Sequence, residues 1–486
     1  MDSVYDKYEA VIGLEVHAQL LTKSKAYSSD PNEYGSVPNT NVSPVTLGHP
    51  GTLPRMNKKV VELAVRLGLA CKSNIARDMF FARKNYFYPD LPKGYQITQD
   101  TTPICTGGSI TIKDDRGNDK EIKITRIHME EDAGKSIHDQ DPYDTLVDLN
   151  RAGVPLVEIV SEPDIRTSTE AYNYLTEIRQ LVQYLDVCDG NMEEGSLRCD
   201  ANISVMLKGS EVYGQRTEVK NMNSIRNVQR AIDYEIKRQI DVIEAGGKIE
   251  METRSFDAVS GKTSSMRSKE MAHDYRYFPE PDLQPVVLTQ AYIDAIKSNL
   301  PALPKELFEK YTKELNLSEY DAYNLTDTKE LAFYFEDVIK STSNYKAAAN
   351  WIMGSIKSYL NQHAIEIQDF TVKPVFIADL IKLIDEGKIS NTLASQQVFP
   401  AMVNQPTISP LELCEKNNWI QNSDSDEIAE LVKQAVEKFP DKVKEYHDGK
   451  TGLIGLFMGE VMKLSKGKAD PKTASKLVVD YLNTIK

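Results

Sequence analysis

The chain has 486 residues, 41% hydrophobic and 27% charged, the ordinary balance of a globular protein long enough for two to four domains. No run of about eighteen apolar residues occurs, and the N-terminus has neither a secretory nor a transit pattern, so a cytoplasmic protein is expected. The net charge of −14 is not typical of a nucleic-acid-binding protein, because contacts with phosphate need Lys and Arg. Any RNA contact therefore requires a local basic patch or a partner chain.

The cysteines exclude two further classes of protein. They number five, are scattered, and never form a C-x-x-C pair: Cys71, Cys105, Cys188, Cys199 and Cys414. This spacing argues against both a disulfide framework and a zinc site made of cysteines. We expect reduced structural thiols.

The first 292 residues mix short β-like runs with two helices. Strands are expected within 8–20, 109–129 and 144–160, and the turn Asn150 to Gly153 predicts a hairpin within the last range. Helices are expected over 167–185, with Thr167 and Glu170 in capping-box spacing, and over 224–246, with Asn223 or Ser224 as N-cap. Strands and helices do not alternate regularly, which favours an α+β fold.

The rest of the chain has a helical pattern. Proline-rich stretches precede helices expected over 306–315, 328–340, 345–360 and 374–389. A second break, 399–410, precedes helices expected over 426–439 and 452–467. The pattern therefore predicts an α+β body over 1–292, an all-α domain over 293–405 and a small helical tail over 406–486.

Acidic residues gather at several places in the body. The stretch from Arg126 to His138 holds three consecutive acids and two histidines, Glu15 and His17 share one strand face, and Glu158 interrupts an apolar run. Each has an ordinary alternative: a solvated turn, a hydrogen-bonded histidine, or a strand with one face in water.

Taken together, these acids favour a metal-dependent phosphate chemistry. Carboxylates without thiolates select a hard ion such as Mg²⁺, which proteins bind together with substrate phosphates. Arg83, Lys84, Arg126 and Lys135 could neutralise phosphate oxygens, so the set indicates ATP. The Gly-Lys-Thr at 261–263 lacks the first glycine of a phosphate loop, because Phe256 stands there, and a surface turn is expected.

The tail supplies a local basic patch. Lysines crowd the segment 450–476 against only two acids, and Lys450, Lys463, Lys466 and Lys468 are candidates for contact with a nucleic-acid backbone. The alternative is a solvated helix end whose lysines complement the helix dipole.

As a set, the motifs resemble a known family. VIGLEVHAQL, RKNYFYPDLPKGYQITQ, RIHMEEDAGKS, LVDLNRAGVPLVEIVSEPDIR, MEEGSLRCDANIS and DYRYFPEPDL occur in this order. They closely resemble the GatB/GatE family, the B subunits of bacterial aspartyl/glutamyl-tRNA amidotransferases. The resemblance covers essentially the whole chain, with a cradle-like body and a YqeY-like tail.

The resemblance implies a function. Members of this family work in a heterotrimer with two partners, a small third subunit and a glutaminase (amidase) subunit. They use ATP and Mg²⁺ to phosphorylate the side-chain carboxylate of Glu on tRNA(Gln) or Asp on tRNA(Asn). Ammonia from the glutaminase then displaces the phosphate. The helical middle and tail are implied to hold the tRNA.

Carried over by motif, the resemblance also implies site residues. The metal site falls on Glu15, His17, Glu130 or Glu131, and Glu158. The implied catalytic residues are Glu15, His17, Glu131 and Glu158, with Lys84 and Asp200 as further candidates in the same cradle. Together with Arg83 and Arg126, which their charge suggests, these two make up the expected nucleotide contacts. Glu130 and Glu131 point to opposite faces of a strand, so one of them is expected at the metal, with Glu131 preferred. Glu131 could instead accept a proton from ammonium.

This sequence departs from the family pattern at one place. Some members have a zinc knuckle where this chain has 27–30 and 43–46, which read Tyr-Ser-Ser-Asp and Ser-Pro-Val-Thr. Serine and threonine are poor zinc ligands, so no zinc is expected.

Three functions remain in competition: the amidating subunit, a stand-alone ATP-dependent carboxylate ligase, and a non-catalytic tRNA-binding scaffold. The chain shows no recognisable amidase nucleophile, which disfavours a self-contained glutamine-dependent enzyme and favours one component of a complex. It also has no arginine- and aromatic-rich RNA module, which weakens the scaffold.

Overall fold

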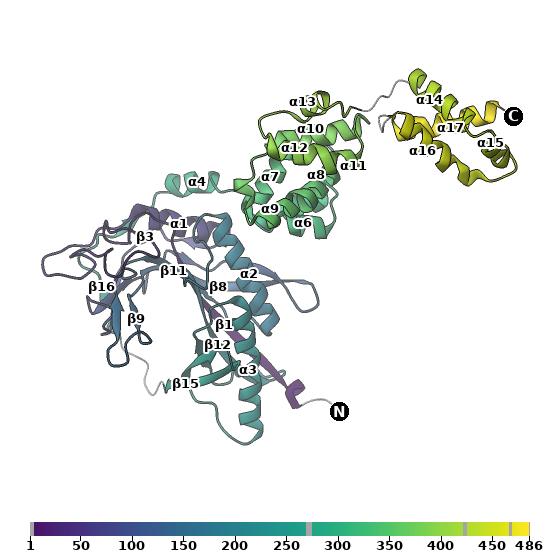
Figure 1. The fold of residues 1–486 in the computed structure, drawn as a ribbon. Coiled ribbons are helices and arrows are strands. Elements are labelled where there is room, and N and C mark those ends of the chain that lie inside the picture. Colours follow the sequence, from purple (N-terminus) through teal and green to yellow (C-terminus); the bar gives the residue numbers. More distant parts are fainter. Residues whose placement is uncertain (1–3, 269–274, 421–424, 466–468, 486) are drawn as a thin grey trace. The chain divides into compact units, whose positions relative to one another are not determined.

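The computed structural model describes residues 4–268, 275–420, 425–465 and 469–485. It divides into two compact units, Met1–Pro304 and Lys305–Lys486 (Figure 1). The first unit combines a large sheet with helices, and the described part of the second consists of helices. This confirms the α+β body followed by helical regions.

One ten-stranded sheet organises the first unit. Its order is β15–β14–β13–β12–β1–β11–β8–β6–β2, with β7 paired to β8. Every neighbouring pair is antiparallel except β13 and β14. The strands are β1 (Tyr8–Gln19), β2 (Asn74–Ile75), β6 (Cys105–Thr106), β7 (Ser109–Lys113), β8 (Asp119–Glu131), β11 (Pro155–Ser161), β12 (Leu197–Leu207), β13 (Thr217–Lys220), β14 (Glu252–Asp257) and β15 (Lys262–Ser268).

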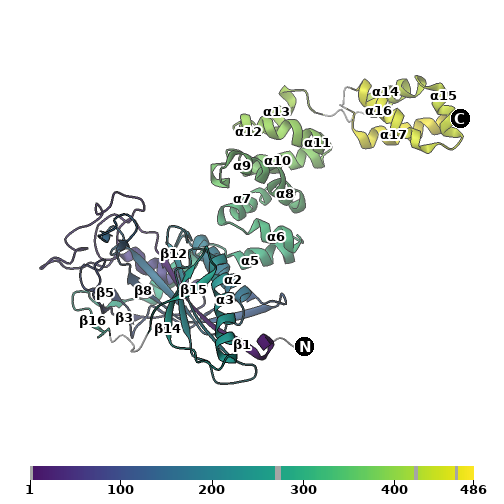
Figure 2. The same cartoon turned by 60° about the horizontal axis from the view of Figure 1, so that its bottom comes forward.

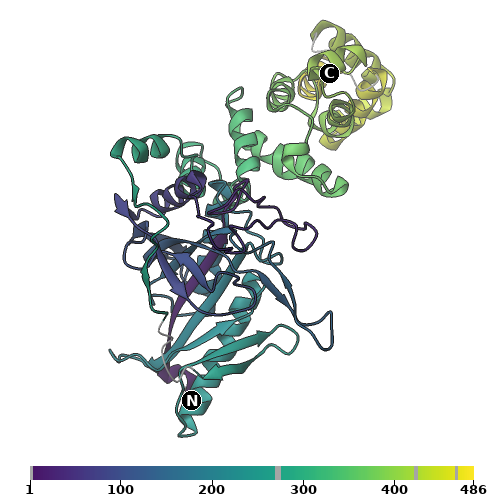
Figure 3. The ribbon, with the colours of Figure 1, turned by 90° about the vertical axis from the view of Figure 1, so that its left-hand side faces the viewer.

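Strand β1 lies in the middle of this sheet, between β11 and β12 (Figure 3). Along it, buried apolar residues such as Leu14 and Val16 alternate with the half-buried Glu15 and His17. Because successive side chains of a strand point to opposite faces, one face of β1 is apolar and the other carries acids and imidazole. The sheet therefore has a core face and a polar face.

Three helices cover the core face: α1 (Lys58–Ala70), α2 (Ser168–Tyr184) and α3 (Ile225–Glu244). Figure 1 shows α2 and α3 running alongside β1 and β12. The side chains of Thr167 and Ser224 accept hydrogen bonds from backbone N–H groups in the first turns of α2 and α3. The helices predicted from these caps are confirmed.

The predicted hairpin around Asn150 to Gly153 is wrong. β10 (Leu146–Asp148) pairs with β9 (Lys135–Ile137), whereas β11 joins the large sheet between β1 and β8. Gly153 does adopt a positive φ of 83°, but the turn redirects the chain from one sheet to another. Turn residues indicate a change of direction, and only tertiary contacts choose the strand partner.

Short strands lie over the polar face. β4 (Ala82–Asn85) is the middle strand between β5 (Tyr95–Thr98) and β16 (Phe278–Pro279), and β5 packs against β8. β3 (Asp78–Met79) pairs with β17 (Val286–Val287). The segment with Gly-Lys-Thr begins as the exposed turn between β14 and β15, as expected from its sequence.

The long irregular segment 20–57 is held by a buried hydrogen-bond cluster. Asp30 accepts hydrogen bonds from the backbone N–H of Ser43, at 3.0 Å, and from the hydroxyl of Thr46. Ser28 contacts the Thr46 hydroxyl at 3.3 Å, and the fully buried Lys25 donates to the carbonyl of Asn41 at 2.6 Å. Asp30 therefore ties together the two stretches where a zinc knuckle would lie.

The second unit contains short helices: α6 (Glu319–Leu325), α7 (Lys329–Ile339), α8 (Tyr345–Trp351), α9 (Lys357–His363), α10 (Pro374–Asp385), α11 (Asn391–Leu393), α12 (Phe399–Asn404) and α13 (Pro410–Lys416). In the sequence, α4 (Gln290–Ser298) and α5 (Pro304–Glu309) precede these helices. The break expected from 399 is wrong in its first half, since 399–404 form α12. Pro400 is the second residue of α12. Proline is tolerated in the first turn of a helix because backbone N–H groups there have no partner within the helix, so Pro400 does not prevent α12 from forming.

Within the described residues, four helices form the tail: α14 (Ser425–Glu437), α15 (Pro440–His447), α16 (Ile454–Leu464) and α17 (Pro471–Thr484), in green to yellow in Figure 2. They share a core that includes Val432, Phe457 and Val478. α13 packs against α10, although it lies beyond residue 406. No helix within the described ranges is long and apolar enough to cross a membrane.

We predict that Asp30→Ala loosens the 20–57 segment. Hydrogen bonds and Lys25 hold the pKa of Asp30 below its usual value despite burial. The carboxylate therefore stabilises the fold at neutral pH, and this contribution is lost as the pH falls through the pKa of the folded state. Losing it leaves buried donors without their acceptor, at a cost of about 1–3 kcal/mol. Amide hydrogen exchange should rise in 26–57 and stay low in β1 and β12.

The matched control is Glu33→Ala, which removes an exposed acid from the same segment. Exchange in 26–57 should match the parent in this control. Equal exchange in the Asp30 variant and the parent would show that Asp30 does not hold the segment.

Candidate active site

The polar face of the sheet lines up four charged residues in one row. In the strand register His17 on β1 lies opposite Glu158 on β11 and Arg198 on β12, and Glu158 lies opposite His128 on β8. Glu130, two residues beyond His128, points to the same face because side chains alternate along β8. Four neighbouring strands thus deliver charged groups to one place.

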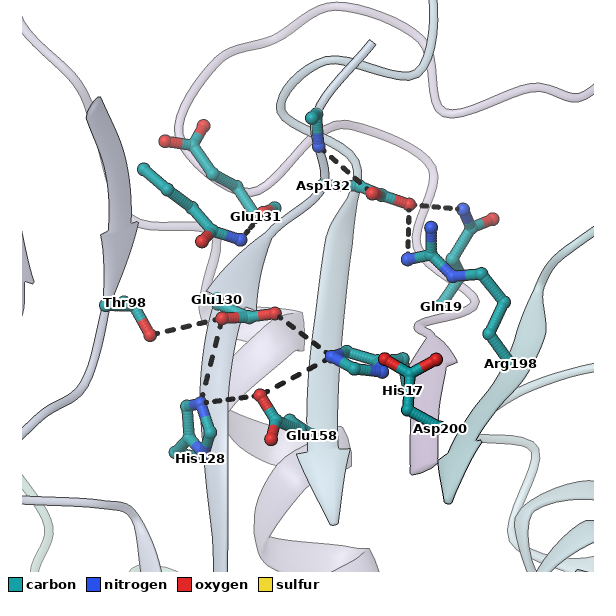
Figure 4. Close-up of polar contacts among 12 residues, drawn as sticks. His17, Gln19, Thr98, His128, Glu130, Glu131, Asp132, Glu158, Arg198 and Asp200 are labelled. Carbon is teal, nitrogen blue, oxygen red and sulfur yellow. Dashed lines mark hydrogen bonds and ion pairs between the residues drawn. The ribbon is translucent and has the colours of Figure 1, made fainter. Parts of the chain in front are cut away.

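Two carboxylates and two imidazoles are in direct contact there (Figure 4). The Nε2 atom of His17 lies 3.4 Å from Glu158 Oε2 and 3.8 Å from Glu130 Oε1. The Nε2 atom of His128 lies 3.3 Å from Glu158 and 3.7 Å from Glu130. Thr98 donates a further hydrogen bond to Glu130, at 3.3 Å. We call His17, His128, Glu130 and Glu158 the acid–histidine cluster.

The cluster is electrostatically self-balanced. Burial opposes the charged form of every member, but the carboxylates raise the pKa of His17 and raise that of His128 to about 9. In return, hydrogen bonds and charge from the imidazoles lower the pKa of Glu130 and lower that of Glu158 strongly. The charged form of each member is thus stabilised by an opposite charge beside it.

A buried carboxylate directly after β8, that of Asp132, holds a guanidinium next to the cluster. Asp132 accepts hydrogen bonds from Gln19 at 2.9 Å and from Arg198 at 2.8 Å (Figure 4). The guanidinium of Arg151 lies 3.7 Å from the same carboxylate. These contacts outweigh burial and keep the pKa of Asp132 low. They hold the Arg198 guanidinium beside the cluster.

A second group of acids lies next to the first. Glu15 lies opposite Asp200 in the pairing of β1 with β12. Glu15, Asp200 and Glu218 each have one carboxylate oxygen within 4.8 Å of the others. Lys220 forms ion pairs with Asp200 and, at 2.9 Å, with Glu218. Burial and the neighbouring acids raise the pKa of Glu15, which accepts a hydrogen bond from Asn202.

The adjacent glutamates Glu130 and Glu131 point to opposite sides, as the alternation predicts (Figure 4). Glu131 does not join the acid–histidine cluster. It forms an ion pair with Lys93 and accepts a hydrogen bond from the N–H of Ile97 at 2.9 Å. It lines a separate cavity of about 240 Å³ that Tyr27 also borders. The structure thus places Glu130, and not the preferred Glu131, beside His17 and Glu158.

The predicted nucleotide contacts separate in a similar way. Lys84 faces the cluster, and the charges of Glu130 and Glu158 overcome burial and raise its pKa. Arg83 points to the other side of β4, where it pairs with Glu280 at 2.7 Å and Asp282 at 3.0 Å. Arg126 lies on the polar face of β8, two residues before His128.

Two of the four predicted tail lysines can be located. Lys450 precedes α16 and pairs with Glu445 at 3.0 Å, and Lys463 lies in the last turn of α16. Lys466 and Lys468 fall outside the described residues. The nucleic-acid contacts of this group stay a prediction.

The donor set of the cluster fits a hard divalent ion. One atom from each of His17, Glu130 and Glu158 falls within 4.8 Å of the others, and carboxylate oxygens are the ligands that Mg²⁺ and Mn²⁺ prefer. A few carboxylates suffice for Mg²⁺, which keeps waters and binds substrate phosphate. The Ser28–Asp30–Thr46 cluster has no soft ligand, so it does not fit zinc.

Sequence reasoning missed three members of this site: His128, Asp132 and Arg198. His128 and Glu130 repeat the two-residue spacing of Glu15 and His17, so the same face argument applied to 126–132 could have found His128. The contact of Asp132 with Arg198 joins positions 66 residues apart. No local pattern indicates that pair.

Comparison with known proteins assigns the family. Residues 10–294 match the model of the GatB/GatE catalytic domain, and residues 333–482 match that of a second GatB domain. The chain is 50% identical over 476 residues to the B subunit of the aspartyl/glutamyl-tRNA(Asn/Gln) amidotransferase of Chlorobium phaeobacteroides, covering 98% of this chain and 99% of the relative. The corresponding protein of Caldicellulosiruptor bescii is 49% identical over 482 residues, 99% of this chain and 100% of the relative.

The first of these matches covers the sheet from residue 10 onward, including the part of every strand that contributes to the acid–histidine cluster. The second covers α10 and the tail helices as far as residue 482. Together with relatives that are alike over nearly their full length, these matches show that the chain belongs to the GatB/GatE family.

Proposed function

We propose that this chain is the ATP- and Mg²⁺-dependent subunit of a cytoplasmic tRNA amidotransferase. It phosphorylates the side-chain carboxylate of Glu on tRNA(Gln), of Asp on tRNA(Asn), or of both. Ammonia then displaces the phosphate and leaves Gln-tRNA or Asn-tRNA. The observation that carries this proposal is the partly buried acid–histidine cluster on the polar face of the sheet, a donor set suited to Mg²⁺.

Phosphorylation of a carboxylate depends on neutralising the charge of the phosphate groups more than on a strong general base. The acceptor is a carboxylate, which needs no deprotonation before it attacks the terminal phosphorus of ATP. Mg²⁺, when bound, supplies positive charge to the phosphate oxygens. Phosphoryl transfer then depends on holding acceptor and phosphate in line.

The residues of the chain divide this work. Glu130, Glu158 and His17 would hold the ion, while His128 and Thr98 orient the two glutamates through the contacts described above. Lys84 approaches from β4 and Arg198 from β12, so two cations can meet phosphate oxygens from different sides. Asp132 acts as a positioning residue for Arg198.

The amidation step places Glu131 in a different role. Its carboxylate is buried in the neighbouring cavity with Lys93, away from the cluster but on the next residue of β8. There it could accept the proton that ammonium must lose before nitrogen attacks. The ammonia would come from a glutaminase (amidase) partner, in a heterotrimer completed by a small third subunit. The relatives are named as B subunits, which supports a multi-subunit complex.

The helical region would hold the tRNA. The tail has its own core around Phe457, and its lysines Lys450 and Lys463 offer charge for the RNA backbone in an otherwise acidic chain. A local group of lysines would let a chain with a net charge of −14 bind the negatively charged RNA backbone.

We predict that Glu158→Gln abolishes phosphorylation. The glutamine keeps the size of the side chain but removes the negative charge that faces both imidazoles, so the phosphoryl-transfer rate should fall by about 100-fold or more. The assay contains the partner subunits, Glu-tRNA(Gln) and ATP labelled in the terminal phosphate. Glutamine hydrolysis by the glutaminase partner should survive in part.

The control for this experiment is Glu211→Gln, an exposed glutamate on the same unit. It should phosphorylate and amidate at the parental rate. Normal activity of the Glu158 variant would show that the cluster is not the phosphoryl-transfer site.

Two neighbouring glutamates make a second, sharper test. We predict that Glu130→Gln weakens Mn²⁺ binding by about 10-fold or more, because it removes one of the clustered ligands, whereas Glu131→Gln binds Mn²⁺ like the parent. Titration calorimetry measures both. The Glu131 variant should instead lose amidation while it still consumes ATP. Weaker Mn²⁺ binding in the Glu131 variant alone would reverse the assignment.

For the tail, we predict that ending the chain after Ile420 weakens tRNA binding by about 10-fold and flattens its salt dependence, because basic side chains and their counterion release are lost. This end point keeps α13, which packs on α10. Filter binding at several salt concentrations measures both quantities. Equal affinity and slope in the shortened chain would show that the tail does not contact tRNA.

A further inference from the structure

Two aromatic-rich stretches far apart in the sequence meet beside the acid–histidine cluster. β4 pairs with β16, which sets Arg83 opposite Phe278, and the N–H of Asn85 donates to the carbonyl of Tyr275 at 3.0 Å. The residues that follow Asn85 are Tyr86, Phe87 and Tyr88. The pairing therefore gathers aromatic rings from both stretches at one end of β4.

The rings form a framework of edge contacts. Tyr86 lies with its ring centroid 6.0 Å from that of Tyr88 and 6.2 Å from that of Tyr275, and both pairs are edge-to-face. Tyr275 in turn meets Tyr277 at 5.9 Å. Edge-to-face packing fixes the orientation of rings while it leaves faces available for another flat group.

Phe87 is the most exposed ring of this group, with 88% of its surface in solvent. Its ring lies against Gly94, where a β-carbon would come within 3.1 Å of it, and Gly94 has a positive φ of 75°. The loop is thus built to keep an apolar ring at the surface. Tyr88 and Phe278 of the same group are exposed as well, and a group of exposed apolar rings is typical of an interaction site.

A groove of about 1060 Å³ runs between these rings. Its walls include Tyr86, Phe87, Tyr88, Tyr275 and Phe278. Polar side chains line it as well: Lys84 and Asn85 on β4, Asp90 on the loop that follows, and Arg276 next to Tyr275. The groove has ample room for a nucleoside, and aromatic walls with polar side chains beside them can hold a flat base together with its sugar or phosphate.

Lys84 connects this groove to the acid–histidine cluster. Its ammonium lies 5.0 Å from the centroid of the Tyr275 ring, and it also interacts with the charges of Glu130 and Glu158. A ligand with a flat base in the groove would therefore place a neighbouring phosphate or ribose near Lys84. Lys84 thus lines the groove and lies within electrostatic range of the two glutamates of the cluster.

We propose that the aromatic groove formed by Tyr86, Phe87, Tyr88, Tyr275 and Phe278 is a stacking site for adenosine, from which the rest of the substrate extends past Lys84 toward the acid–histidine cluster. This inference rests on the proposed function. Both substrates of that reaction carry adenosine: ATP, and the aminoacylated tRNA, whose amino acid is attached to a terminal adenosine. Stacking of a base on aromatic rings suits either source.

Fluorescence of 2-aminopurine, which falls when the base stacks, separates the two sources. One probe is 2-aminopurine riboside triphosphate with Mg²⁺, and the other is an acceptor-stem minihelix with 2-aminopurine as its 3′-terminal base. The full-length chain in complex with its partner subunits should quench one of them. In Phe87→Ala and Tyr88→Ala the affinity for that probe should fall by about 10-fold.

Three controls make the result specific. Tyr213→Ala removes an exposed tyrosine outside the groove and should bind both probes like the parent. Inorganic tripolyphosphate has no base, so its Mg²⁺-dependent binding should be equal in parent and groove variants, which also reports that those variants are folded. The Glu158→Gln test of the proposed function measures phosphoryl transfer, and its outcome does not depend on base stacking.

The inference is overturned if neither probe is quenched, if Phe87→Ala and Tyr88→Ala bind the probe like the parent, or if they lose tripolyphosphate binding to the same extent. If Glu158→Gln abolishes phosphorylation while the groove variants bind normally, the proposed function stands and the stacking site fails. If Glu158→Gln phosphorylates normally, the proposed function fails, whatever the probes report.

Discussion

The balance of buried opposite charges on the polar face of the sheet is the interaction on which the candidate site depends. An isolated carboxylate or imidazolium in this position would lose its hydration without compensation and would shift to the neutral form. Here two glutamates and two histidines each contact both members of the opposite kind. Each charged form is therefore stabilised by its neighbours, and a divalent ion could supply the positive charge that the two glutamates face.

This balance requires a particular sheet order. β1 must lie beside β11, and β11 beside β8, for His17, Glu158 and His128 to share a row. The core face explains why that order is kept, since the apolar residues of the same strands pack under α1, α2 and α3. A shift of one residue in the register would bury the charged groups among aliphatic side chains and expose the core.

Alternation along β8 also separates two tasks that follow one another in the proposed reaction. Glu130 faces the cluster, and Glu131 faces a different cavity with Lys93. Phosphorylation and nitrogen delivery could thus occupy opposite sides of one strand, one residue apart. The aromatic groove extends the first side, because Lys84 borders both the groove and the cluster.

Local sequence determined the elements and several site residues of this protein. Period-two alternation located Glu15 and His17 on one face of β1, caps located α2 and α3, and the apolar run that Glu158 interrupts singled out that acid. These features are short-range, so they can be seen within about twenty residues. The tertiary structure alone decided which strands pair. Tertiary packing therefore pairs β10 with β9 and not with β11. It also brings Arg198 to Asp132, and it places Glu130 rather than Glu131 beside His17. Pairing between distant strands depends on how the whole core packs, and no local pattern in the chain contains that information.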